Sequence, residues 1–255
     1  QMQENLYPKG FDAWWMDASE PDMTPRPELE SQKEYLNPTH LGSGARMLLG
    51  YPLMLAKTVY EGQRQELPDQ RVFNLTRSGY LGLQRYGAAS WSGDITSTWT
   101  AMKKQIAAGV SYSVSGLPYW TMDSGGFSVP GRFDPAAATK ADVEEWNELN
   151  TRWFEFSTFV PLLRVHGQFP RREMWCFGEP GSPSYDAMVA NDNLRYRLLP
   201  YIYSVAGAVV QNGTIMMRPL GVAFPRDREA CELNDQFLFG PALMVSPVTD
   251  YKART

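Results

Sequence analysis

The sequence predicts an α/β fold built around a parallel β-sheet. Short apolar segments of strand length, bounded by polar residues or glycine, alternate along the chain with longer amphipathic segments of helical periodicity. Strands that alternate with helices are typical of a parallel sheet with helical crossovers. Of the 255 residues, 43% are hydrophobic, so the chain is long and apolar enough to bury a substantial core.

The individual elements follow from this periodicity. The segments expected to be buried parallel strands are residues 11–16, 72–75, 88–91, 114–120 and 161–165. The segments expected to be helices are residues 45–60, 96–108, 140–156 and 185–210. Two long loops, 21–41 and 167–184, interrupt the alternation, and an apolar strand-like run follows at 237–248. Loops of that length inside a compact domain usually carry function.

Composition restricts the class of partner. The chain has 24 Lys and Arg against 28 Asp and Glu, a net charge of -4, so neither nucleic acid nor an anionic membrane surface is expected to bind. No apolar run approaches the roughly 20 residues of a membrane helix, so no membrane span is expected. Cys176, Cys231 and two histidines are too few for a disulfide framework or a usual zinc site, and both cysteines are expected to be buried.

A polar residue stands at or just beyond the end of each predicted strand. In chain order these residues are Asp17, Arg77, Asp94, Asp123 and His166. Polar groups at the carboxyl ends of parallel strands converge on one mouth in a (β/α)8 barrel, where catalytic residues come from different strands. Five strands cannot close an eight-stranded barrel. The sequence therefore predicts the second half of such a barrel, about strands 4 to 8.

Two of these polar residues are carboxylates beside large aromatic side chains. Asp17 ends the segment Trp14-Trp15-Met16-Asp17, and Asp94 ends Trp91-Ser92-Gly93-Asp94. Glycoside hydrolysis needs one carboxylate that attacks or stabilises the anomeric carbon and one carboxyl group that protonates the leaving oxygen. Apolar surroundings favour the protonated acid, and a nearby arginine keeps the nucleophile ionised. The pattern indicates a glycosidase site.

Simpler interpretations of the same residues stay open at this point. The acidic cluster of Asp17, Ser19, Glu20 and Asp22 fits a helix-capping loop, or a Mg²⁺ site of a phosphoryl-transfer enzyme, although no Walker-type glycine loop accompanies it. Asp94 fits the cap of the helix that follows it. The other candidates have these alternatives: a turn residue for Asp123, a core histidine for His166 and a surface ion pair for Arg77.

Six motifs follow one another along the chain. They are Gly10-Phe-Asp-Ala-Trp-Trp-Met-Asp17-Ala-Ser-Glu20-Pro-Asp22, Thr76-Arg77-Ser-Gly, Gln84-Arg85-Tyr-Gly, Trp91-Ser-Gly-Asp94, Pro118-Tyr-Trp-Thr-Met-Asp123-Ser-Gly-Gly-Phe127 and Pro161-Leu-Leu-Arg-Val-His166-Gly. In order and spacing they resemble glycoside hydrolase family 31. The similarity continues to Phe239-Gly-Pro-Ala-Leu-Met-Val-Ser-Pro247, so it covers essentially the whole chain.

The resemblance implies a role for each site residue. Asp17 matches the nucleophile that forms a covalent glycosyl-enzyme, and Asp94 matches the general acid/base. The implied outcome is retention of the α configuration, with the two carboxyl groups about 5 to 5.5 Å apart. Arg77 and His166 match groups that hold sugar hydroxyls in the -1 subsite. The other matches are Trp15, Trp91 and Phe127, which line the pocket, and Asp123, near its floor.

The resemblance also suggests a substrate. The segments after Asp17 and Arg77 are more similar to bacterial α-xylosidases that trim xyloglucan oligosaccharides than to α-glucosidases, which are the alternative. An oligosaccharide is thus the expected partner, and no metal or organic cofactor is implied. Oligomeric state stays open, with a homo-oligomer possible, and so does localisation.

The resemblance divides the chain into two domains. Residues 1–212 are expected to form the partial catalytic barrel, and residues 213–255 the start of a C-terminal β-domain. Residues 1–7 read as the end of a helix and lack the features of a signal peptide, so we expect the protein's N-terminus to lie upstream. A third hypothesis is that the chain by itself is not an active enzyme, because it lacks the first strands of the barrel.

Overall fold

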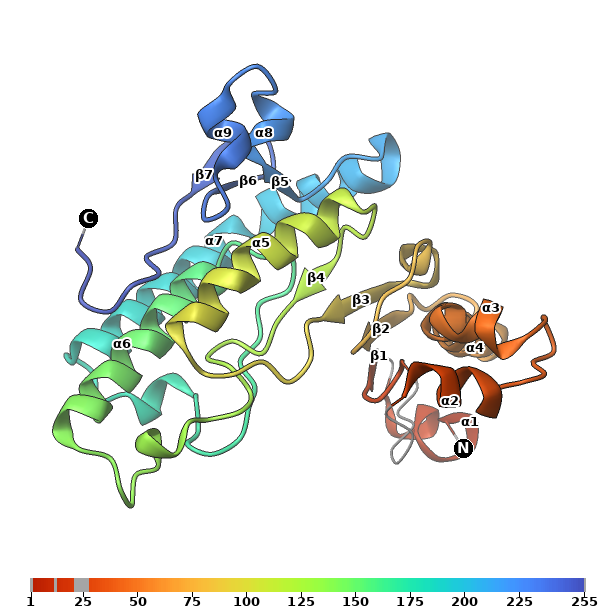
Figure 1. Cartoon of the computed structure of the whole chain (residues 1–255), viewed down its shortest axis with the longest axis horizontal. Helices are drawn as coiled ribbons and strands as arrows, with labels where there is room; N and C mark the ends of the chain where they lie inside the picture. The colour runs from red at the N-terminus through yellow and green to blue at the C-terminus, as the bar shows by residue number, and fades with distance from the viewer. Residues whose placement is uncertain (1, 12, 21–27, 255) are drawn as a thin grey trace. The chain divides into compact units, whose positions relative to one another are not determined.

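A computed structural model describes residues 2–11, 13–20 and 28–254 of the chain (Figure 1). The chain divides into two compact units, unit 1 (residues 1–91) and unit 2 (residues 92–255), and each is described by itself. Among the described residues, no helix combines the length and apolar character needed to cross a bilayer.

Three parallel strands lie side by side in unit 1, in the order β1, β2, β3. They are β1 (Ala13–Met16), β2 (Phe73–Thr76) and β3 (Ala88–Trp91). The helices are α1 (Met2–Asn5), α2 (Leu29–Tyr35), α3 (Gly44–Met47) and α4 (Tyr51–Glu66), with 3-10 turns η1 (Tyr7–Lys9), η2 (Leu48–Gly50) and η3 (Leu83–Tyr86). The strands predicted at 11–16, 72–75 and 88–91 are thus present within one or two residues.

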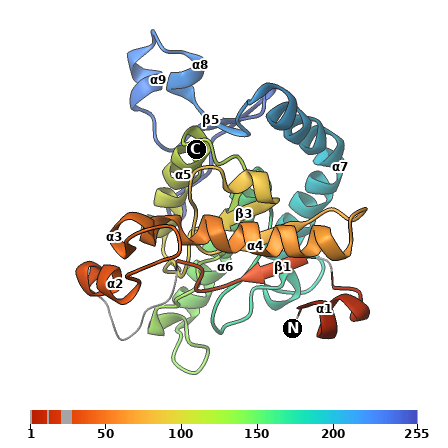
Figure 2. The same cartoon turned by 90° about the vertical axis from the view of Figure 1, so that its right-hand side faces the viewer.

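The longest helix of unit 1, α4, is labelled in Figure 2 and packs on β2. It is also tied to β1, because the buried Trp14 donates its indole N–H to Gln63 Oε1 at 2.8 Å. The single helix predicted at 45–60 is wrong in detail. Pro52 lies in the first turn of α4, a position that proline favours, and the preceding residues form the separate short helices α3 and η2.

Unit 2 is mainly helical around a short strand (Figure 1). Its elements are α5 (Trp99–Val114), β4 (Trp120–Thr121), η4 (Gly131–Phe133), α6 (Lys140–Ser157), η5 (Met174–Cys176), α7 (Pro183–Asn212), β5 (Met217–Pro219), α8 (Leu220–Ala223), α9 (Arg228–Glu232), β6 (Phe237–Phe239) and β7 (Leu243–Val245). Helix α6 packs against α7, and α5 packs against β4 and β5. Antiparallel β5, β6 and β7 form a separate sheet.

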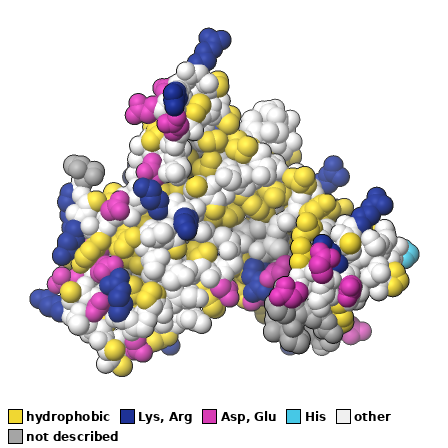
Figure 3. All heavy atoms as spheres, viewed as in Figure 1, with side chains coloured by type: hydrophobic (Ala, Val, Ile, Leu, Met, Phe, Trp, Pro, Cys, Tyr) yellow, Lys and Arg dark blue, Asp and Glu magenta, His cyan; other side chains and the backbone are white. Residues whose placement is uncertain are grey.

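Helices α5 and α6 begin at residues whose side chains cap them. Thr98 accepts a hydrogen bond from the Ala101 N–H at the start of α5. Thr139 and Asp142 form a reciprocal capping box at the start of α6. Their apolar faces then pack into one core, which includes Met102, Ile106, Trp120, Met122, Leu149, Trp153, Phe156, Met217, Phe237 and Phe239. On the visible face of unit 2, acidic and basic side chains are interspersed among apolar ones (Figure 3).

Two predicted strands are wrong. At 114–120, Val114 still belongs to α5, a turn follows, and only Trp120 and Thr121 are extended as β4. At 161–165 no strand forms, and Val165 makes only an isolated parallel bridge to Ser124. Side chains occupy the carbonyls that a ladder would use: Arg195 donates to the Pro161 oxygen and Thr121 to the Leu162 oxygen.

Other expectations also need correction. The loop at 21–41 contains α2 in its described part, while residues 21–27 lie outside the described residues. The run at 237–248 is not one strand but the hairpin of β6 and β7, which turns at residues 240–242. Cys176 and Cys231 are exposed, not buried. The expected α/β class is nevertheless confirmed.

Candidate active site

The predicted site residues of unit 1 gather at the carboxyl ends of β1 and β2. Asp17 directly follows β1, and its Oδ1 lies 3.0 Å from Nη1 of Arg77, which directly follows β2. Arg77 also donates through Nε to Glu20 Oε1 at 2.7 Å, and its Nη2 forms an ion pair with the same carboxylate. The backbone joins the two strand ends as well, since the Arg77 N–H donates to the Met16 carbonyl. One guanidinium therefore holds two carboxylates.

The turn after Asp17 is fixed by local hydrogen bonds. The Ala18 N–H donates to Asp17 Oδ1 at 2.8 Å, and Ala18 has a positive φ of 53°. Beneath it the buried Ser19 hydroxyl lies 2.9 Å from the Thr76 hydroxyl. These contacts differ from those of a helix-capping loop, because the Asp17 side chain bonds the next residue and an arginine instead of a helix N-terminus.

Two tryptophans stack beside this carboxylate group. The rings of Trp15 and Trp91 have centroids 5.4 Å apart and an interplanar angle of 21°. Trp91 is 3% exposed, whereas Trp15 is 52% exposed. The buried ring thus supports the exposed one, and the face of an exposed tryptophan is a surface on which a sugar ring can stack.

In unit 2, Asp94 is an exposed residue of the loop between residue 92 and α5. It is not the cap of α5, because Thr98 fills that position. The segment before it is held to the helix, since the Ser92 hydroxyl donates to Gln105 Oε1 at 2.5 Å. Asp94 is therefore an accessible carboxylate on an anchored loop.

Asp123 follows β4 and is completely buried. Its Oδ1 lies 2.6 Å from Nη1 of Arg164, while its Oδ2 has no hydrogen-bond partner among the described residues. Burial raises the pKa of Asp123 above its ordinary value, and the Asp94 carboxylate adds to the rise; Arg164 and His166 act in the opposite direction without cancelling it.

Phe127 joins the loops that carry these residues. Its ring stacks on the half-buried His166 ring, with centroids 5.7 Å apart, so His166 is not a core histidine. The Phe127 N–H donates to the Ile95 carbonyl at 2.6 Å, and the Phe127 carbonyl accepts from the Gln168 N–H at 3.0 Å. The close approach requires glycine at 126, where φ is 81° and a Cβ would lie 2.5 Å from the Ser97 backbone.

The structure thus brings the predicted residues into two groups. Trp15, Asp17, Arg77 and Trp91 gather in unit 1; Asp94, Asp123, Phe127 and His166 gather in unit 2. Asp22 of the predicted acidic cluster lies outside the described residues. Within the described ranges, no three His, Cys, Asp or Glu side chains gather closely enough to form a metal site.

Sequence reasoning missed two arginines that hold the group in unit 2. Arg164 pairs with Asp123, and Arg172, which is 5% exposed, hydrogen-bonds the carbonyls of Gln168 and Pro170 and the Ser97 hydroxyl. The signal for Arg164 is a charged residue inside the apolar run Leu-Leu-Arg-Val, two positions before His166. For Arg172 the sequence offers no comparable signal, because arginines are common in polar loops.

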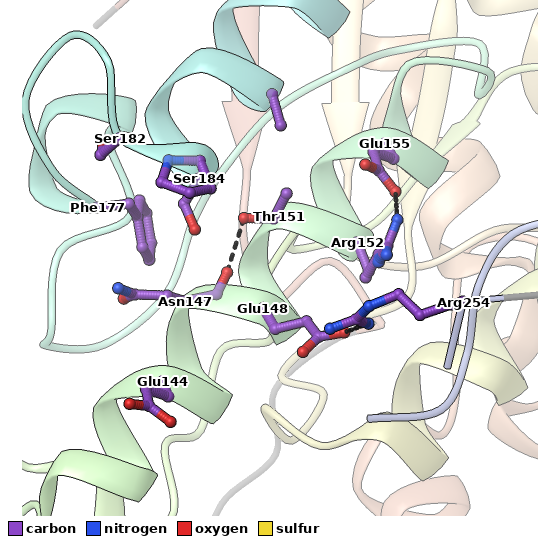
Figure 4. Close-up of a pocket in the computed structure, with 12 residues that line it drawn as sticks. Glu144, Asn147, Glu148, Thr151, Arg152, Glu155, Phe177, Ser182, Ser184 and Arg254 are labelled. Carbon is purple, nitrogen blue, oxygen red and sulfur yellow. Dashed lines mark hydrogen bonds and ion pairs between the residues drawn. The ribbon is translucent and has the colours of Figure 1, made fainter. Parts of the chain in front are cut away.

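A pocket of about 490 Å³ also lies in unit 2, and Figure 4 shows the side chains that line it. Side chains of α6 line it together with the start of α7 and Arg254, which forms an ion pair with Glu148 at 2.8 Å. Arg152 and Glu155 form a second pair on the same helix at 2.9 Å. None of the predicted site residues lines this pocket.

The chemistry available at the strand ends is acid–base and nucleophilic chemistry on a polyol. In unit 1, a carboxylate paired with an arginine can act as a nucleophile, and in unit 2 an accessible carboxyl group can transfer protons. Exposed aromatic faces and a stacked histidine can bind a sugar by stacking and hydrogen bonds.

Known proteins resemble the chain over nearly its whole length. The model of the glycosyl hydrolases family 31 TIM-barrel domain matches residues 1–205, and that of the family 31 C-terminal domain matches residues 213–255. An α-xylosidase of Saccharolobus solfataricus is 41% identical over 96% of this chain and 32% of its own length. Alpha-glucosidase 2 of Bacillus thermoamyloliquefaciens is 33% identical over 78% of this chain and 23% of its own length.

A solved structure is similar as well. The crystal structure of the family 31 α-xylosidase of Xanthomonas citri superposes with a TM-score of 0.94 and 48% identity, covering 99% of this chain and 27% of that one. The chain therefore spans about a third or less of the length of these relatives. By both of its domain models and by these relatives, the chain belongs to glycoside hydrolase family 31.

Proposed function

We propose that the whole protein is a retaining α-glycoside hydrolase, an α-xylosidase that removes non-reducing-end α-xylosyl units from xyloglucan oligosaccharides. The observation that carries this proposal is the similarity to two α-xylosidases, at 41% and 48% identity, across almost the entire chain. The carboxylates and aromatic rings at the strand ends are consistent with it.

In the proposed reaction, Asp17 attacks the anomeric carbon while the glycosidic C–O bond breaks and Asp94 gives its proton to the departing oxygen. Arg77 holds the Asp17 carboxylate in place by direct pairing at 3.0 Å. Asp94, now ionised, takes a proton from water, the water oxygen attacks the anomeric carbon, and the ester to Asp17 breaks. Both carboxyl groups return to their starting states, so no other reactant is needed.

The remaining site residues bind the sugar in this proposal. Trp15 offers its exposed face to the ring, supported from behind by Trp91. His166 and Phe127 hold the sugar, and Asp123 fixes the floor through its ion pair with Arg164. Hydrogen bonds between the site residues and the sugar contribute to catalysis where they strengthen as the oxocarbenium-like transition state develops.

An α-glucosidase is the alternative, favoured by the similarity to alpha-glucosidase 2. The two substrates differ by one hydroxymethyl group, which an apolar pocket discriminates by only about 1 to 3 kcal/mol. The deciding experiment measures kcat/KM of the whole protein on aryl α-xyloside and aryl α-glucoside, and follows the first-formed anomer by NMR. A preference for the xyloside with an α-anomeric product supports the proposal. A preference for the glucoside selects the alternative, and a β-anomeric product refutes retention.

A further inference from the structure

The buried arginine of the loop after His166 contacts all the chain segments that carry the site of unit 2. Arg172 is 5% exposed, and its Nη2 donates to the Ser97 hydroxyl at 3.3 Å, three residues beyond Asp94. Its Nη1 donates to the Pro170 carbonyl at 3.0 Å and to the Gln168 carbonyl, within its own loop. One rigid group therefore joins the Asp94 loop to the His166 loop.

The third segment, the turn after Asp123, is packed directly against the same side chain. Gly125 has a φ of 91°, and a Cβ at this position would lie 2.8 Å from Arg172 Cδ. The Asp123 carboxylate acts on Arg172 in the direction that raises its pKa, although burial outweighs this effect. On its other side Arg172 lies over the Trp146 ring, 5.3 Å from its centroid, so α6 supports it.

Backbone hydrogen bonds join these segments only in pairs. The Ile95 carbonyl accepts from the Phe127 and Ser128 N–H groups, and the Gln168 N–H donates to the Phe127 carbonyl. Among the described residues no backbone hydrogen bond joins residues 94–98 directly to residues 164–172, as Arg172 does through Ser97. A guanidinium offers several donors in one plane, which lysine cannot reproduce. Burial costs this cation solvation and lowers its pKa to about 10, so at neutral pH it stays charged. The buried, charged guanidinium of Arg172 is therefore held in a fixed position by the carbonyl groups that it contacts.

We propose that Arg172 is a positioning residue of the active site, whose guanidinium fixes the relative placement of the segments that carry Asp94, Phe127 and His166. The proposal rests on the proposed function. Because a displacement of about 1 Å at a catalytic group can cost about 100-fold in rate, loosening these segments acts mainly on kcat.

The test compares two buried arginines of the whole protein. Arg195 on α7 is the matched control: it is 9% exposed, its pKa is likewise lowered to about 10 by burial, and it donates to the carbonyls of Thr158, Val160 and Pro161. We expect Arg172→Lys to lower kcat on the aryl α-xyloside by about 10- to 100-fold with little change in KM. We expect Arg195→Lys to lower Tm by about as much as Arg172→Lys does, but to keep kcat within about twofold of wild type.

Two further measurements separate positioning from loss of folding. Ser97→Ala removes only one bond of Arg172, and we expect a smaller loss of kcat at almost unchanged Tm. In Arg172→Ala, added guanidinium is expected to restore part of kcat, whereas Arg195→Ala gains nothing. If Arg172→Lys and Ser97→Ala both keep wild-type kcat, or if the Arg195 variant loses as much kcat as the Arg172 variant, the proposal is overturned.

Failure of the proposed function gives a different result, namely a wild-type protein that hydrolyses neither aryl glycoside. Amide hydrogen exchange does not depend on activity and still tests the proposal in that case. We expect Arg172→Lys to accelerate exchange in residues 94–98, 123–128 and 164–172, and Arg195→Lys to leave these segments unchanged. Unaltered exchange in the Arg172 variant would show that this side chain does not hold the three segments.

Discussion

The Asp17 carboxylate is accessible to solvent and is also held in a fixed position. It is about half exposed, yet one oxygen is placed both by the next backbone N–H and by Arg77. Exposed ion pairs contribute only about 0 to 1 kcal/mol to stability, so this pairing matters more for chemistry than for folding. A substitution at Asp17 should therefore affect activity much more than stability.

We expect Asp17→Ala to lower kcat of the whole protein by more than about 1,000-fold, a rise of roughly 4 kcal/mol in the activation free energy, with Tm nearly unchanged. The reason is that the substitution removes the carboxylate that is proposed to form the glycosyl-enzyme. Glu20→Gln is the control, because Glu20 shares Arg77 but has no proposed covalent role. Activity of Asp17→Ala within tenfold of wild type would rule out the nucleophile assignment.

Asp94 allows a second test at the same scale. For Asp94→Ala we expect a large loss of kcat/KM on natural oligosaccharides and a much smaller loss on aryl glycosides with good leaving groups, since general acid catalysis is worth about 100- to 10,000-fold only where the leaving oxygen needs a proton. A series of aryl α-xylosides with graded leaving-group pKa measures this dependence. Equal losses across the series would argue against Asp94 as the acid.

At the scale of elements, ion pairs join the ends of neighbouring chain segments in addition to the backbone pairing of the short strands. Arg77 joins β1 to β2, and Arg164 joins the segment before His166 to the end of β4. Short strands position a site well only when such side chains fix their ends. The contribution of the Arg164–Asp123 pair to stability should depend on the ionisation of the buried Asp123 carboxyl group.

We expect the stability of wild type relative to Asp123→Asn to fall as pH rises. Burial raises the pKa of folded Asp123 above its unfolded value of about 3.9, so its stabilising contribution is complete below that pH and is lost as pH rises through the folded-state pKa. Urea unfolding of both proteins at several pH values from about 4 upward measures this difference. A difference that is constant, or that grows with pH, would contradict a raised pKa.

Elements with a strong local signal were predictable, and those set by tertiary contacts were not. The short apolar run of β3 and the helical periodicity of α6 are visible in the sequence, and both elements lie where expected. Residues 161–165 are as apolar as a strand, but Arg195 and Thr121 take their carbonyl groups from a distance. Nothing local to that segment encodes those partners.

The candidate site was predictable to a similar degree. A polar residue after an apolar run identified Asp17, Arg77 and His166, because strand ends are marked in sequence. Their mutual contacts through Glu20, Arg164 and Arg172 were not predictable, since each joins segments far apart in the chain.

At the scale of the whole molecule, the chain contains residues of two family 31 domains. We propose that their boundary lies at 212/213, where α7 ends at Asn212, between the ranges that the two domain models match. The Tyr201 hydroxyl of α7 donates to the Phe239 carbonyl of β6 and accepts from the Ala242 N–H, so the proposed domains share hydrogen bonds.

We predict that residues 1–255 produced alone do not hydrolyse either aryl glycoside, whereas the whole protein does. The relatives are about three times as long or longer, and a (β/α)8 barrel needs eight strands to close. The measurement compares kcat/KM of both proteins, with circular dichroism and size-exclusion chromatography of the shorter one. Activity of the shorter protein within about tenfold of the whole protein would contradict this prediction.

The two carboxylates that share Arg77 have one more consequence, which concerns charge balance over a catalytic cycle. When Asp17 becomes an ester in the proposed reaction, its negative charge disappears, but Glu20 keeps its bonds to Nε and Nη2 of the same guanidinium. Before the step, the one positive charge of Arg77 faces two carboxylates. After it, Arg77 and Glu20 form a neutral pair, so the arginine keeps a partner throughout. It stays in place to receive the carboxylate when water releases the sugar.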